Sequence, residues 1–379
     1  MSVSPSREDE LMLLAATATA HDAARAWAEF RVSTELGRDL DAVDGEQARL
    51  LPLLWRNLTA AGGDDPDLTR MKGAWRRAWS HNQLLFNDLG GALKVLGDRG
   101  IPSVLLKGAA LVALGWYDAG ARPMEDADVL VPADRFDEAA RALGESGWER
   151  PPVPQMLEPA AHLINDAGRT LDLHSVIADG FALRVRPHMS MVGPWARAVP
   201  IDVSGHLTLT LCPSDLLLHV CIHGLQADGH GRLRWIADAI TVTRHGVVDW
   251  DLLAEEAARR RAAIRVEAAL RYLHLRMGIA IPESVLVRLA GAPLTWRDRL
   301  IDQSWTEPPP ASRGARVLRR YARITAYETW PVAAYTFPGY MKQVWGIEGW
   351  RDVGRRLVRR LTGSWRRPHD TRHTGLGDD

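Results

Sequence analysis

Two aspartates separated by one residue, Asp126 and Asp128, are the part of this sequence best suited to chemistry. The apolar run 127–131 predicts a strand, and residues two apart leave the same face of a strand. Carboxylates held that close repel each other unless a divalent cation such as Mg²⁺ neutralises them. Asp172 lies inside a second apolar run, 170–174, and adds a third candidate ligand. A solvated strand face beside a turn is the alternative interpretation of the pair.

A lysine and a glycine precede the first acid-bearing strand. Residues 101–106 predict a strand that runs into Lys107 and Gly108, and residues 109–117 predict a helix. A glycine lets the backbone approach a phosphate, and the start of a helix adds positive potential. Only four of the 47 basic residues are lysines, which favours a phosphate contact for Lys107. A lysine that lies along a sheet edge is the alternative.

Arg122 and His174 flank the acids in the sequence. Arg122 would neutralise phosphate charge, or would pair with Glu125 or Asp126. His174 shares a strand face with Asp172, which places it on the acceptor side or makes it a hydrogen-bond partner of the acids.

Two further pairs, each four residues apart, lie on predicted helices downstream. His219 and His223 have a spacing that can bind zinc, but the glutamate of a His-Glu-x-x-His motif is missing. We therefore expect a histidine pair that is satisfied by hydrogen bonds or lines a cleft. Arg234 and Asp238 are explained by an ion pair within one helix.

Together these elements resemble the nucleotidyltransferase superfamily, over roughly residues 85–275. The Leu-Lys-Gly element and the Arg-x-x-x-Asp-x-Asp strand are similar to a branch with members in peptide natural-product gene clusters, and to toxin-type nucleotidyltransferases. The helices that carry His223, Arg234 and Asp238 are also similar to that branch. The usual Gly-Ser pair is absent, because Gly108 is followed by Ala109.

The resemblance implies transfer of a nucleotidyl group from an NTP such as ATP to an acceptor, with two Mg²⁺ ions. Catalytic and metal-binding roles then fall to the three acids, Asp126, Asp128 and Asp172. Nucleotide-binding roles fall to Lys107, Gly108 and Arg122. Positions around the ligands or on the acceptor side fall to His174, His223, Arg234 and Asp238. A peptide or small-molecule acceptor is favoured; the alternatives are a toxin-like enzyme acting on RNA or tRNA, and an inactive module that binds a nucleotide or partner.

Composition limits the other classes of protein. Acidic and basic residues are equal at 47 each, which excludes a uniformly basic nucleic-acid binder. The segment 312–367 alone carries twelve arginines and Lys342 against three acids. Two cysteines are too few for a disulfide framework, and no apolar run predicts a signal peptide or a membrane span. We expect a cytoplasmic protein without membrane contacts, whose oligomeric state the sequence leaves open.

The predicted fold class is α+β, a small mixed sheet with helical additions at both ends. Its expected parts are a helical region over 1–97, the nucleotidyltransferase core over 98–212, a helical bundle over 213–306, a basic helical segment over 307–367 and a disordered tail over 368–379. Within them we expect helices over 45–60, 68–96, 133–147, 215–226, 231–244 and 249–277, the last interrupted near 262, and hairpins joining 162–164 to 170–174 and 199–203 to 206–211.

Overall fold

The computed structural model describes residues 5–34, 39–150, 160–175, 188–225 and 233–306, together with positions 312, 315, 318 and 321. These residues belong to one compact unit, Met1–Tyr327. The second unit, Glu328–Asp379, lies outside the described residues, as do most of the predicted basic segment and the tail. The predicted domain boundaries after residues 97, 212 and 306 remain predictions.

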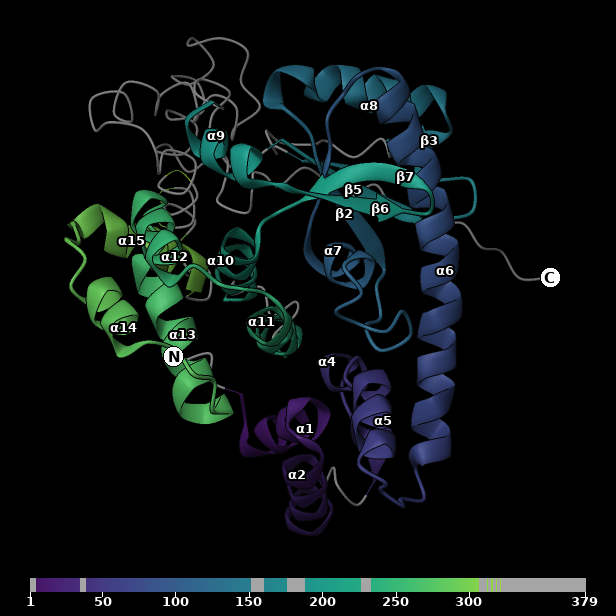
Figure 1. Cartoon of the computed structure of the whole chain (residues 1–379), viewed down its shortest axis with the longest axis vertical. Helices are drawn as coiled ribbons and strands as arrows, with labels where there is room; N and C mark the ends of the chain where they lie inside the picture. The colour runs from purple at the N-terminus through teal and green to yellow at the C-terminus, as the bar shows by residue number, and fades with distance from the viewer. Residues whose placement is uncertain are drawn as a thin grey trace, which may run out of the picture. The chain divides into compact units, whose positions relative to one another are not determined.

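A mixed sheet lies at the centre of the described chain and confirms the predicted fold class (Figure 1). Its order is β3-β4-β5-β2-β1-β7-β6, with β2 parallel to β5 and β1 parallel to β7. The strands are β1 Val104–Leu105, β2 Asp126–Leu130, β3 Trp148–Glu149, β4 Ala160–Asn165, β5 Thr170–His174, β6 Val199–Val203 and β7 His206–Thr210.

Both predicted hairpins form. β4 and β5 are antiparallel, and the side chain of Asn165 accepts hydrogen bonds from the backbone amides of Ala167 and Arg169 in the connecting turn. Gly168 takes a left-handed φ of 73° there, which glycine adopts without strain. β6 and β7 are joined at Ser204 and Gly205, both with positive φ. Turn chemistry therefore sets the register of β5, which carries Asp172, against β4.

The N-terminal part is helical, as predicted. Ser6 and Asp9 form a reciprocal capping box at the start of the first helix. The predicted helix over 45–60 is instead two helices, because Pro52 lacks the amide that would continue the hydrogen-bond ladder through Arg49 and Leu50. The elements are α1 Arg7–Thr17, α2 Ala20–Ser33, η1 Leu40–Ala42, α4 Gly45–Ala48, α5 Leu51–Ala60 and α6 Leu68–Asp98.

Two hydrophobic cores use opposite faces of the acid-bearing strand. Ala127 and Val129 point into a core that includes Leu89 of α6 and Leu143 of α8. Leu130 belongs to the other core, with residues of α10 and α11. Alternation along β2 therefore turns Asp126 and Asp128 away from α6 and α8.

The helices predicted over 109–117, 133–147, 215–226, 231–244 and 249–277 form with shifted bounds, including the break near residue 262, where Arg261 has a φ of 53°. Three further helices of the described chain, over 188–197, 283–290 and 296–306, were not predicted. The remaining helices are α7 Lys107–Ala113, η2 Ala133–Arg135, α8 Phe136–Glu145, α9 His188–Arg197, α10 Pro213–Gly224, α11 Arg234–His245, α12 Trp250–Arg259, α13 Ala263–Met277, α14 Glu283–Ala290 and α15 Trp296–Thr306. Among the described residues, no helix combines the length and apolar character needed to cross a bilayer.

Candidate active site

The register of two parallel strands assembles the site. Asp128 of β2 is paired with Asp172 of β5, and Leu130 is paired with His174. Paired residues share a face, so Asp126, Asp128, Asp172 and His174 all leave the same side of the sheet. The strand alternation predicted from the sequence is thereby confirmed, and it brings acids 44 residues apart in the chain next to each other.

Asp128 is the most enclosed of these acids, with 4% of the residue exposed. Its Oδ1 accepts a hydrogen bond of 2.5 Å from Lys107 Nζ and lies 2.9 Å from His174 Nε2. Burial raises the pKa of the Asp128 carboxyl, but the nearby Lys107 ammonium and His174 together hold that pKa well below its usual range. Asp128 is therefore ionised near neutral pH and forms an ion pair with Lys107.

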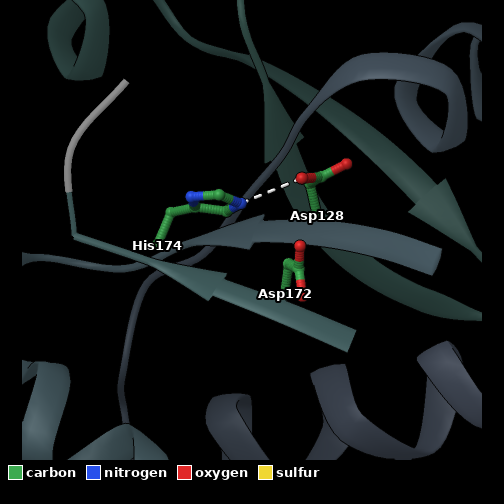
Figure 2. A group of neighbouring side chains, drawn as sticks. All are labelled: Asp128, Asp172 and His174. Carbon is green, nitrogen blue, oxygen red and sulfur yellow. Dashed lines mark hydrogen bonds and ion pairs between the residues drawn. The ribbon is translucent and has the colours of Figure 1, made fainter. Parts of the chain in front are cut away.

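Three side chains converge closely enough to share an ion. Asp128, Asp172 and His174 each offer one ligand atom, and these atoms all lie within 4.8 Å of one another (Figure 2). Figure 2 shows the His174 ring directed at the Asp128 carboxylate, with Asp172 on the neighbouring strand beside them. Asp126, one of the three acids predicted as ligands, is not in this closest group among the described residues.

Asp126 lies two residues before Asp128 on β2, where the charges of Asp128 and Asp172 act on it. Burial and the adjacent charge of Asp128 raise the pKa of the Asp126 carboxyl, whereas Lys107 and Arg234 act in the opposite direction. Among the residues that the structure describes, none donates a hydrogen bond to the Asp126 carboxylate. Its neighbour Glu125, which precedes β2, is exposed and pairs with Arg49.

Sequence reasoning missed His162, which lies directly opposite Asp172 across the β4–β5 hairpin. Its Nδ1 is 2.7 Å from Asp172 Oδ1, and its side chain is 49% exposed. The hairpin was predicted with His162 in it, so counting back from the turn would have placed this imidazole beside Asp172. The exposed His162 thus connects the Asp172 carboxylate to solvent.

Arg122 pairs with Asp238, not with the Glu125 or Asp126 that the sequence offered as partners. Its Nε and Nη2 donate to the two carboxylate oxygens of Asp238 at 2.9 and 2.7 Å, and both side chains are buried. Asp238 thus pairs with Arg122 rather than with Arg234. The predicted phosphate contact of Arg122 remains a prediction.

Gly108 has a packing reason that the sequence did not reveal. A Cβ at this position would lie 2.4 Å from the guanidinium carbon of Arg122, so any larger residue would displace the buried ion pair. The residue before it, Lys107, holds a φ of 48°, a left-handed conformation that costs a non-glycine residue roughly 1–2 kcal/mol. The contact between Lys107 and Asp128 is therefore made from a strained backbone conformation.

The helices α10 and α11 supply the predicted histidines and Arg234. His219 and His223 stack with ring centroids 6.0 Å apart and planes 3° apart. Burial lowers the pKa of His223 to about 3 and that of His219 well below its usual value. Neither ring nitrogen of His219 has a hydrogen-bond partner among the described residues.

Arg234, the first residue of α11, is partly buried and makes no hydrogen bond or ion pair with another described residue. Burial and the positive charge of Arg122 lower its pKa to about 10. The carboxylates of Asp238 and Glu46 offset these effects only in part, so Arg234 is a partly buried cation whose charge also acts on Asp126.

A strand–turn–helix element with a basic turn, followed by paired acid-bearing strands in a small mixed sheet, is the arrangement of a nucleotidyltransferase. The chain belongs to a family described as "Uncharacterised nucleotidyltransferase", whose model matches residues 45–278. The resemblance to the nucleotidyltransferase superfamily is thereby confirmed.

One similar solved structure is an antigenic nucleotidyltransferase-like protein from Paracoccidioides brasiliensis, with 13% identity and a TM-score of 0.34. The match covers 56% of this chain and 94% of that one. No curated protein matches the sequence.

Proposed function

We propose that this protein moves an NMP from an NTP to a hydroxyl or phosphate of a peptide or small molecule, with two Mg²⁺ ions and ATP among its nucleotides. The observation that carries the proposal is the register of β2 on β5, which sets Asp128 beside Asp172 with Asp126 on the same face. Membership of the nucleotidyltransferase family supports the same reaction class.

The donor chemistry fits divalent cations. Asp126 and Asp128 offer carboxylate oxygens from one strand, and Asp172 adds a third carboxylate from the next. These residues would hold the two ions, Asp126 and Asp128 toward the triphosphate and Asp172 toward the acceptor. Bound Mg²⁺ supplies positive charge that stabilises the transferring phosphoryl group and lowers the pKa of an acceptor hydroxyl.

The side chains of the protein perform the remaining steps. The acceptor oxygen forms a bond to the α-phosphorus, and the bond to the bridging oxygen breaks with its electron pair leaving on pyrophosphate. The Asp172 carboxylate accepts the acceptor proton, and the partly exposed His162 on its Oδ1 gives that proton a route to solvent. Lys107 neutralises phosphate oxygens, as Arg122 would in the sequence-based prediction.

An RNA acceptor would be favoured if the basic segment 312–367 lined the site, and the structure describes only isolated positions of that segment. The peptide or small-molecule acceptor is therefore retained from the resemblance to members of peptide natural-product clusters. An inactive nucleotide-binding module is the rival that a transfer assay separates from both.

The decisive experiment incubates the purified protein with Mg²⁺, each α-³²P-labelled NTP and a cell extract, and follows label into peptide, small-molecule and RNA fractions. We expect label in a peptide or small-molecule fraction, and its loss with Asp128→Asn and Asp172→Asn. Asp166→Asn, in the exposed turn of the same hairpin, is the matched control and should retain transfer.

Two results would contradict the proposal. Nucleotide binding without transfer by the wild-type protein would identify an inactive module. Label recovered only in RNA would support the nucleotidyltransferase activity but show that the acceptor is RNA.

A further inference from the structure

His174 gives the metal site a nitrogen donor that an all-carboxylate set lacks. It follows Asp172 by two residues on β5, so its side chain leaves the same face. Its Nε2, rather than its Nδ1, is directed at Asp128 and lies 2.9 Å from Oδ1 (Figure 2). The ring edge thus faces the acids, which is the orientation that a metal ligand requires.

The three ligand atoms are close enough for one ion. Two atoms bound to a first-row transition ion at about 2.1 Å can be no more than roughly 4.2 Å apart. Ligand atoms that all lie within 4.8 Å therefore need only small side-chain movements to meet such an ion. His162 on Asp172 supplies the outer hydrogen bond that commonly orients a ligating carboxylate.

Donor chemistry then decides which ion this position takes. Mg²⁺ binds oxygen almost exclusively and keeps much of its water, whereas imidazole nitrogen suits the first-row transition ions. Two carboxylates with one imidazole are therefore a poor set for Mg²⁺. Among the first-row transition ions, Mn²⁺ is the one that carboxylate ligands suit, and two of the three donors here are carboxylates.

We propose that Asp128, Asp172 and His174 form a mixed oxygen–nitrogen site for a first-row transition ion, with Mn²⁺ as the ion that fits its donors. This site differs from the all-oxygen position of Asp126 and Asp128, where Mg²⁺ would accompany the nucleotide. The inference rests on the proposed function for the acceptor-side position at Asp172, and it replaces Mg²⁺ with Mn²⁺ there. The mixed site binds its ion in the absence of nucleotide. The protein thus holds two unequal metal positions that share Asp128.

The test reads nitrogen ligation directly. Mn²⁺ is added to the nucleotide-free full-length protein, and pulsed electron paramagnetic resonance measures coupling of the bound ion to nitrogen. We expect a ¹⁴N coupling that changes to the ¹⁵N pattern when the protein is labelled with ¹⁵N-histidine. His174→Asp, which supplies a third carboxylate, should still bind Mn²⁺ but without nitrogen coupling, and should lower the ratio of Mn²⁺ to Mg²⁺ affinity about tenfold.

Controls keep the result interpretable. His81→Asp, on an exposed position of α6, should leave the coupling and the affinity ratio unchanged. His174→Gln is a second variant in case the aspartate fails to fold, and it should also lose the coupling. Wild-type protein without bound Mn²⁺, bound Mn²⁺ without nitrogen coupling, or coupling that persists in a folded His174 variant would overturn the site.

The outcome is separable from that of the proposed function. Nitrogen coupling without nucleotidyl transfer would support the metal site and refute the enzyme. Transfer with Mg²⁺ but no nitrogen coupling would support the enzyme and refute the mixed metal site.

Discussion

Lys107 Nζ lies 2.5 Å from Asp128 Oδ1, the same oxygen that His174 contacts. The ammonium therefore sits where it neutralises the acid that both proposed metal positions share. A divalent cation that binds Asp128 takes over this role, and Lys107 must then move to another anion. The triphosphate of an incoming NTP is such an anion, so this contact couples metal binding to nucleotide binding.

The first prediction concerns Lys107→Met. Without the competing ammonium, Mn²⁺ should bind the nucleotide-free protein about tenfold more tightly, whereas ATP should bind at least tenfold more weakly. The loss leaves a buried carboxylate without its main cation, which costs about 3–5 kcal/mol of stability. Isothermal titration and thermal melts with and without Mn²⁺ measure these effects, and Mn²⁺ should restore much of the lost stability.

The matched control is Lys94→Met, which removes an exposed lysine paired with Asp98 on α6. It should change neither affinity, because exposed pairs contribute little. Weaker Mn²⁺ binding by Lys107→Met would show that Lys107 supports the metal site instead of competing with it.

Much of the site was predictable because it depends on local pattern. Alternation in strands placed Asp126, Asp128 and Asp172 on one face, and the turn at Asn165 to Gly168 fixed the hairpin. These inferences need only the twofold period of a strand and the chemistry of a turn. What they could not supply was the register of β5 on β2, which is set by packing between distant segments.

Contacts between distant segments account for what the sequence did not reveal. Arg122 and Asp238 are 116 residues apart and meet only when α11 packs beside the α7 turn. From sequence spacing alone, the expected partners of Arg122 were the nearest acids, and the expected partner of Asp238 was Arg234, one helical turn away. Burial decides otherwise, because an enclosed guanidinium is stabilised most by a bidentate carboxylate.

A second prediction tests this buried pair through Gly108→Ala. The added Cβ would overlap the Arg122 guanidinium, so Gly108→Ala should destabilise the protein by about 1–3 kcal/mol. In an Arg122→Ala background the space is open, and the same alanine should cost less than about 1 kcal/mol. Urea unfolding of the four proteins in the cycle measures the coupling, and additive effects of the two substitutions would contradict the contact.

A third prediction concerns acid stability and the stacked pair His219 and His223. Burial lowers the pKa of both imidazoles below their value in the unfolded chain, to about 3 for His223. Above pH 6.5 both are neutral in either state and contribute no pH dependence. As the pH falls below 6.5 only the unfolded chain takes up these protons, so stability is lost, at up to about 1.4 kcal/mol per pH unit for each histidine.

Urea unfolding at pH 7.5 and 5.5 checks this sign. The wild-type protein should lose about 2–3 kcal/mol from the two histidines between these values, and His219→Leu should lose about half as much. His81→Leu, which removes an exposed histidine, should behave as wild type. Equal acid sensitivity of His219→Leu and the wild-type protein would contradict a neutral buried His219.

The last prediction assigns Arg234 to the nucleotide phosphates. Its guanidinium is partly buried near Asp126, and no described residue pairs with it, so the free protein bears a desolvation cost that an anion would relieve. Arg234→Met should weaken Mg²⁺–ATP binding at least tenfold while leaving the melting temperature equal or higher. Arg141→Met, on an exposed position of α8, should change neither. A lower melting temperature with unchanged ATP affinity would instead assign Arg234 to the fold, and this combination of signs separates it from Lys107, whose removal should weaken both.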